Sequence, residues 1–225
     1  MKKISILLLV AMLMLFQFGC NATEEPKQIK VSPDYAVATD ISEMVKNAET
    51  IVIGTFQEYK HSYNAERNPK NEHEESKEAY SETKVYSFNV EKSLKGDVTE
   101  SSSIQVSIPY TKELTGLRDE QGKELRFRIP SIGHVQPTLG KRYVLFLMKN
   151  ERTNSYQAPF TPYMIEIQND NKVVLQKPQE KVQTSFRSSN NQYQISVEGV
   201  HLEKDEISGK DLNVLINEVK NELES

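Results

Sequence analysis

Residues 140–148 read GKRYVLFLM, a run in which six consecutive side chains, Tyr143 to Met148, are apolar. Successive side chains of a β-strand point to opposite faces of the sheet. A strand that is apolar at every position is therefore apolar on both faces, and both faces must be covered. We predict that this run is a central strand, and the rest of the fold is built outward from it.

Shorter stretches on both sides of this run alternate between apolar and polar residues, which indicates strands with one buried face. In ELRFRI, residues 124–129, the apolar side chains share one face, whereas Arg126 and Arg128 share the other. Residues 163–176 contain two such stretches joined by Asn-Asp-Asn, which predicts a hairpin. Further strands are predicted at IVIGTF (51–56), TKVYSFNV (83–90), SSSIQVSIPY (101–110) and NNQYQISVEG (190–199).

Two amphipathic helices are predicted at the ends of this β-rich region. Asp40 and Glu43 resemble a helix-capping box, and apolar residues then recur at helical spacing, at Ile41, Met44, Val45 and Ala48. Residues 208–225 carry a second apolar stripe, made of Leu212, Leu215, Ile216, Val219 and Leu223. We expect a mainly β fold with a minor α component, an antiparallel barrel or sandwich of about seven or eight strands flanked by these helices.

The order of these elements resembles that of one group of small barrels. A helix, the strand IVIGTF (51–56), a strand ending in LKGD (94–97) and then GKRYVLFL (140–147) resemble secreted domains with partly closed OB-like barrels. The resemblance covers residues 40–150 and contains no motif that is specific for a function. It implies a barrel fold and no particular activity.

The beginning of the chain has the composition of an export signal. Lys2 and Lys3 precede an apolar run, residues 4–16, which is shorter than the ~20 residues that a membrane-spanning helix needs. Cys20, which is the only cysteine of the chain, follows soon after this run. A basic start, an apolar core and then Gly-Cys resemble the precursors of bacterial lipoproteins.

This resemblance implies that a signal peptidase cuts between Gly19 and Cys20, and that the Cys20 thiol carries a diacylglyceryl group. Gly19 fits the pattern of the family, whereas Gln17 and Phe18 depart from it. The lipid bilayer is then a partner of the chain. We expect the mature protein to be held on the outer face of the cytoplasmic membrane of a Gram-positive-type cell.

These features divide the chain into three parts. Residues 1–19 are the predicted signal peptide, residues 20–36 are the lipidated cysteine with a flexible tether, and residues 37–225 form one extracytoplasmic domain. Residues 58–82 are strongly charged and lack Val, Ile, Leu and Phe, which predicts a solvated loop within that domain. The formal net charge of −4 becomes −6 without the two signal-peptide lysines, so nucleic acid is not an expected partner.

The sequence contains no clear motif for catalysis or for binding a metal or cofactor. The acidic residues around His73 lack the paired histidines of a zinc helix, and no G-x-S-x-G elbow is present. His134 lies in the Gly- and Pro-flanked loop IPSIGHVQP (129–137), where a hydrolase-type site would be built. Because a lone loop histidine is more often simply exposed, we predict no catalytic residue, no metal and no cofactor.

Residues 112–142 are basic within an acidic chain. If Arg126 and Arg128 share a sheet face with Lys141 or Arg142, these four residues would contact an anionic ligand, such as an envelope polymer or a lipid headgroup. The alternative is an ordinary solvent-exposed face on which the charges are paired.

The sequence favours a binding or interaction module tethered at the cell envelope, whose partner is an envelope polymer or a membrane protein. The alternatives are a hydrolase-type enzyme that acts on an envelope substrate and a structural accessory of a membrane complex. A binding module should show a groove or patch without convergent ionisable groups. An enzyme should show a pocket with perturbed carboxylates or histidine, and an accessory should show a large apolar surface.

Overall fold

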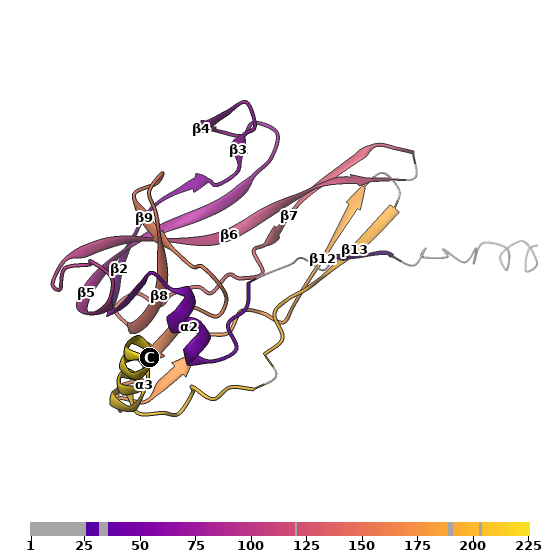
Figure 1. The fold of residues 1–225 in the computed structure, drawn as a ribbon. Coiled ribbons are helices and arrows are strands. Elements are labelled where there is room, and N and C mark those ends of the chain that lie inside the picture. Colours follow the sequence, from indigo (N-terminus) through magenta and orange to yellow (C-terminus); the bar gives the residue numbers. More distant parts are fainter. Residues whose placement is uncertain (1–25, 32–35, 120, 189–190, 203) are drawn as a thin grey trace, which may run out of the picture.

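The computed structural model describes residues 26–31, 36–119, 121–188, 191–202 and 204–225 (Figure 1). The fold is mainly β with two helices, as predicted. Its large sheet has the order β11-β10-β8-β2-β5-β6-β7, and β9 joins it by pairing with both β6 and β8. The strands are β2 (Thr50–Asn64), β5 (Ser81–Lys95), β6 (Ser103–Arg118), β7 (Glu124–Pro130), β8 (Arg142–Asn150), β9 (Ser155–Gln157), β10 (Met164–Ile167) and β11 (Val173–Leu175).

β8 is the central strand that the GKRYVLFLM run predicted. Its side chains from Tyr143 to Leu147 are at most 1% exposed, so both faces of the strand are buried in the main core. One edge of β8 pairs with β2. The other edge is shared, because residues 142–145 pair with β10 and residues 148–150 pair with β9.

The short strand β9 connects two distant parts of the large sheet. It runs parallel to β6 and antiparallel to β8. Backbone pairing can therefore be followed from β2 through β5, β6, β9 and β8 and back to β2. Within this circuit β2 and β5 approach closely at Gly54, where a Cβ atom would lie 2.0 Å from the carbonyl oxygen of Asn89. A glycine is required there because any side chain would collide with backbone.

The helices α2 (Ile41–Asn47) and α3 (Leu212–Glu224) lie side by side, at the lower left of Figure 1. The Asp40 carboxylate accepts a hydrogen bond from the Glu43 N–H (2.9 Å), which confirms the predicted cap of α2. The Glu43 carboxylate reaches back to the backbone N–H of Thr39 (2.7 Å). The buried residues of the two helices are Ile41, Met44, Val45, Leu212, Leu215 and Val219, whereas Leu223 at the end of the predicted stripe is 38% exposed.

A second sheet has the order β1-β13-β12. Here β1 (Lys27–Val31) runs parallel to β13 (Asn191–Glu198), and β12 (Lys181–Ser188) runs antiparallel to β13. We call this sheet, together with β7 and residues 111–118 of β6, the arm; it extends to the right in Figure 1. The arm has its own small core, made of Ile129, Ile132, Val182, Ile195 and Val197.

The charged stretch 58–82 is largely exposed, as its composition predicted, but most of it forms strands and not a loop. β2 continues to Asn64, and β3 (Arg67–Asn68) and β4 (Asn71–Glu75) form a small ribbon before β5 begins. The Asn64 side chain is 6% exposed and bonds to the carbonyl oxygens of Ser76 and Ala79 and to the N–H of Ser81. Backbone pairing and one buried amide thus order this segment without an apolar core of its own.

The predicted flexible tether, residues 20–36, is wrong in part. Residues 27–31 form β1, in which alternate side chains are half-buried and Ile29 and Val31 pack against the core of the arm. Parallel pairing with β13 supplies backbone hydrogen bonds that composition alone does not reveal. The described fold therefore begins before residue 37. Among the described residues, no helix is long and apolar enough to cross a membrane.

Candidate functional site

A shallow pocket of about 170 Å³ lies where four separate segments of the chain meet. The turn after β7 supplies Ser131 and Gly133, β6 supplies Pro109, and the segment between β9 and β10 supplies most of the remaining wall. Ala36 closes the pocket from the N-terminal side, because its carbonyl oxygen accepts a hydrogen bond from the Thr161 N–H (2.9 Å). The full lining is Ala36, Pro109, Ser131, Gly133, Ala158, Pro159, Phe160, Thr161 and Tyr163.

The pocket wall contains two buried hydroxyl groups. Thr161 is 5% exposed and Tyr163 is 1% exposed, and neither hydroxyl has a hydrogen-bond partner among the described residues. Burial raises the pKa of the Tyr163 hydroxyl far above its usual range, so this group stays neutral. Leaving a buried hydroxyl unpaired costs ~1–3 kcal/mol. No lining residue carries a charge, so the site suits an uncharged group.

His134 is the next residue after Gly133 of the pocket wall. Its Nδ1 lies 2.8 Å from the carbonyl oxygen of Pro109 and must carry the proton, because a carbonyl oxygen only accepts. The ring packs edge-on against Tyr110, with a centroid distance of 5.1 Å, and Lys84 Nζ lies over the Tyr110 ring. Burial has the largest effect and lowers the pKa of His134. The hydrogen bond to Pro109 opposes this effect, and the charge of Lys84 adds to it.

The surroundings of His134 do not make a catalytic dyad. Within the described ranges, no carboxylate or hydroxyl side chain is hydrogen-bonded to its ring. Nucleophilic and general-base mechanisms need such a partner within hydrogen-bond reach. His134 is therefore a neutral, half-buried histidine that holds the turn after β7 against β6.

The predicted anion-binding residues are separated into two groups. Arg126 and Arg128 lie on β7, where Arg126 contacts the carboxylate of Glu124 (3.3 Å) and the carbonyl oxygen of Glu78 (3.1 Å). The guanidinium of Arg128 stacks over the ring of Tyr80, 3.9 Å from its centroid. Both side chains therefore bind the segment that precedes β5 to the edge of β7.

Lys141 and Arg142 lie at the start of β8, and β2, β5 and β6 stand between β8 and β7 in the sheet order. Lys141 pairs with Glu166 (3.8 Å), and Arg142 makes a two-pronged contact with Glu91 (2.7 and 3.0 Å). Hydrogen bonds from Arg142 lower the pKa of Glu91. Each of the four basic residues thus has a protein partner, which is a carboxylate for Arg126, Lys141 and Arg142 and an aromatic ring for Arg128.

The cleavage and lipidation positions, Gly19 and Cys20, lie outside the described residues. No group of His, Cys, Asp and Glu side chains in the described part of the chain could hold a metal ion. The acidic stretch around His73 lies on the exposed strand β4.

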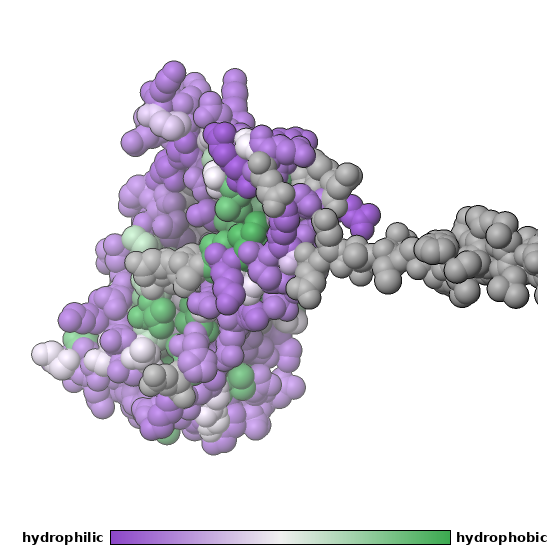
Figure 2. All heavy atoms as spheres, turned by 90° about the vertical axis from the view of Figure 1, so that its right-hand side faces the viewer, coloured by the Kyte–Doolittle hydropathy of each residue, from purple (hydrophilic) through white to green (hydrophobic). Residues whose placement is uncertain are grey.

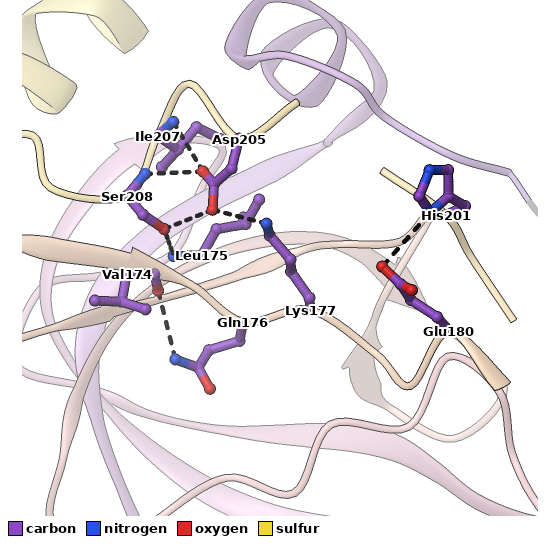
Figure 3. A network of polar contacts seen from close by, with 9 residues as sticks. All are labelled: Val174, Leu175, Gln176, Lys177, Glu180, His201, Asp205, Ile207 and Ser208. Carbon is purple, nitrogen blue, oxygen red and sulfur yellow. Dashed lines mark hydrogen bonds and ion pairs between the residues drawn. The ribbon is translucent and has the colours of Figure 1, made fainter. Parts of the chain in front are cut away.

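A partly exposed polar cluster that sequence reasoning missed lies before α3 (Figure 3). One oxygen of the Asp205 carboxylate accepts hydrogen bonds from the N–H groups of Ile207 (3.1 Å) and Ser208 (2.9 Å). The other accepts from the Ser208 hydroxyl (2.8 Å) and from Lys177 Nζ (3.0 Å). The Ser208 oxygen in turn accepts from the Leu175 N–H (2.9 Å), which ties this turn to β11.

Asp205 is held in its charged form by this cluster. Burial alone would raise its pKa, but the hydrogen bonds from Ser208, Lys177 and Ile207 outweigh burial and lower the pKa to about 2. Figure 3 also shows the exposed pair of His201 and Glu180 (3.5 Å), which is separate from the Asp205 cluster. The histidine is not in the cluster, and the cluster ties the turn before α3 to β11 and to Lys177. The spacing Asp-x-x-Ser is the only local signal that could have predicted it.

Comparison with protein-family models, with curated proteins and with solved structures found no match to this chain.

Proposed function

We propose that this protein is a bacterial lipoprotein whose β-rich domain is a binding module at the cell envelope. The basic start, the apolar run and Gly19-Cys20 support lipidation of Cys20 and a position on the outer face of the cytoplasmic membrane. The pocket beside Thr161 and Tyr163 supports a binding role, because it is concave, mostly apolar and lined by no ionisable pair.

The pocket also suggests which chemical class binds. A volume of about 170 Å³ suits one apolar side chain or one small ring rather than a polymer. The lining is mostly apolar and uncharged, which favours an apolar, uncharged occupant. We infer that the partner is a membrane or envelope protein that inserts a single side chain of this kind.

The barrel fold is part of this proposal. The circuit of pairing through β2, β5, β6, β9 and β8 supports a small five-stranded barrel of the OB-like kind. The parallel pairing of β6 with β9 is the contact that would close such a barrel. A hydrolase is the less favoured alternative, because His134 beside the pocket has no hydrogen-bonded carboxylate or hydroxyl side chain among the described residues.

The anchor is tested by mass spectrometry of the full chain after expression in a bacterium with a lipoprotein pathway. We expect a product that begins at Cys20 and carries the mass of a diacylglyceryl group. Cys20→Ala should lack this mass and should leave the membrane fraction. A wild-type protein of unmodified mass, or a Cys20→Ala variant that stays in the membrane fraction, would contradict the anchor.

The pocket is tested by photo-crosslinking in living cells of the source. A benzoylphenylalanine replaces Ala158 in the pocket wall or, as a control, the exposed Asn217 on α3. We expect one partner to be captured only from position 158. Gly133→Val should abolish that capture, because a Cβ at Gly133 meets no atom within 4 Å and the added side chain would occupy the pocket without disturbing the fold. Equal capture from both positions, or capture that survives Gly133→Val, would reject the pocket as the binding site.

A further inference from the structure

At the distal end of the arm, the start of β1 lies beside the ends of the β6–β7 and β12–β13 hairpins. In the pairing of β1 with β13, Lys27 lies opposite Tyr193. Tyr193 stacks on Phe186 (5.1 Å between centroids), and Phe186 stacks on Phe127 of β7 (4.7 Å). This aromatic stack therefore holds the ends of the β6–β7 and β12–β13 hairpins beside the point at which the chain enters the fold. We call this end, residues 118–119, 121–124, 186–188, 191–193 and 27, the arm tip.

The length of chain before β1 limits where the arm tip can lie. Cys20 precedes Pro26, the first described residue, by six positions. Six residues span at most about 20 Å when fully extended. If Cys20 is lipidated, as the proposed function holds, the arm tip is therefore the part of the fold nearest to the bilayer. The helices α2 and α3 lie at the opposite side of the molecule in Figure 1.

The charges at the arm tip are suited to an anionic surface. Lys123 and Arg187 are exposed, and neither side chain has an ionic or hydrogen-bond partner among the described residues. The acidic groups there are engaged: the Asp119 carboxylate accepts from the N–H groups of Gln121 and Lys123 (2.9 and 2.8 Å), and Glu124 pairs with Arg126. Figure 2, which looks at this side of the molecule, shows hydrophilic residues around an apolar patch.

We propose that the arm tip rests on the headgroup layer of the same bilayer that holds the lipid anchor. The arm tip also carries the carboxylates of Asp119 and Glu124, so net charge does not supply the affinity. The lipid anchor supplies the affinity for the membrane, and the unpaired side chains of Lys123 and Arg187 orient the domain. Each cation near an anionic membrane surface contributes about a fivefold factor in binding. The arm then acts as a spacer that presents the helices away from the bilayer.

The test measures depth at single positions in the lipidated protein. Because the only natural cysteine is Cys20, whose sulfur the anchor occupies, one introduced cysteine is the only thiol that a fluorophore can label. Gln121→Cys and Gln192→Cys mark the arm tip, and Asn217→Cys marks α3; all three positions are exposed. The labelled proteins are placed in phosphatidylglycerol–phosphatidylcholine vesicles that contain headgroup spin-labelled lipid.

We expect the lipid quencher to reduce the fluorescence of the two arm-tip labels at least threefold more than that of the α3 label. Equal quenching, or stronger quenching at Asn217→Cys, would overturn the proposed orientation. Lys123→Gln with Arg187→Gln should reduce this difference, whereas the matched control Lys220→Gln on α3 should not. An unchanged difference in the double variant would overturn the role of the two cations.

Flotation of the same vesicles separates this inference from the proposed function. A protein that floats with the vesicles but shows no preferential quenching at the arm tip contradicts the orientation alone. A protein that carries no lipid mass and does not float contradicts the anchor itself.

Discussion

Replacing Asp205 by asparagine should destabilise the fold by an amount that depends strongly on pH. Asparagine keeps the shape of the side chain and can still accept from the N–H groups of Ile207 and Ser208. It loses the negative charge that faces Lys177 Nζ at 3.0 Å, and the amide NH2 that replaces Oδ2 cannot accept from the Ser208 hydroxyl. The Asp205 side chain is 19% exposed, but Lys177 is 43% exposed, so solvent screens part of this charge contact.

The magnitude follows from the pKa of Asp205. A pKa lowered from 3.8 to about 2 in the folded protein corresponds to about 2.4 kcal/mol of stability. Because the carboxyl pKa is lower in the folded protein, ionised Asp205 stabilises the fold. This contribution is complete above pH 4, where Asp205 of the unfolded chain is also ionised, and it is lost as pH falls through 2. At pH 3 about 1.3 kcal/mol should remain.

The assay is urea unfolding of the wild type and Asp205→Asn at pH 7 and pH 3. We expect a difference of about 2 kcal/mol in the free energy of unfolding at pH 7, and about half of this at pH 3. Glu206→Gln is the matched control, because Glu206 is the next carboxylate in the chain but is largely exposed and pairs only with Lys204. It should change stability much less. A pH-independent difference, or an equal loss in Glu206→Gln, would refute the reasoning.

Three further substitutions test the fold and the site. Asn64→Ala should lower the unfolding free energy by ~1–3 kcal/mol and expose residues 65–80 to protease, because it removes the bonds to the part-buried backbone groups of Ser76, Ala79 and Ser81; unchanged proteolysis would contradict this. Gly54→Ala should prevent soluble folding, because its Cβ would lie 2.0 Å from the carbonyl oxygen of Asn89, whereas Gly133→Ala should fold normally. The pKa of His134 is lowered in the folded protein, so its contribution to stability is present above pH 6.5 and is lost as pH falls. In His134→Gln, the melting temperature should therefore fall less between pH 7 and pH 5 than in the wild type.

Local patterns in the sequence were sufficient for some elements of the fold. The apolar run 140–148 marks a strand buried on both faces, and β8 is that strand. Asp40 marks the start of α2, because a cap acts within three residues of itself. Such features are readable because the residues that make them are neighbours in the chain.

Contacts between residues that are distant in the chain could not be predicted from the sequence, because no local pattern encodes them. The charged residues of β2 lie in a strand because their backbone pairs with β5. The composition of the segment does not reveal this pairing. β1 is ordered by β13, more than 150 residues away. The pocket depends on Ala36, Pro109, Gly133 and Thr161 meeting in space, and the four basic residues were kept apart by the strand order for the same reason. Periodicity determines which face of an element is buried, but only the pairing of strands determines which residues become neighbours.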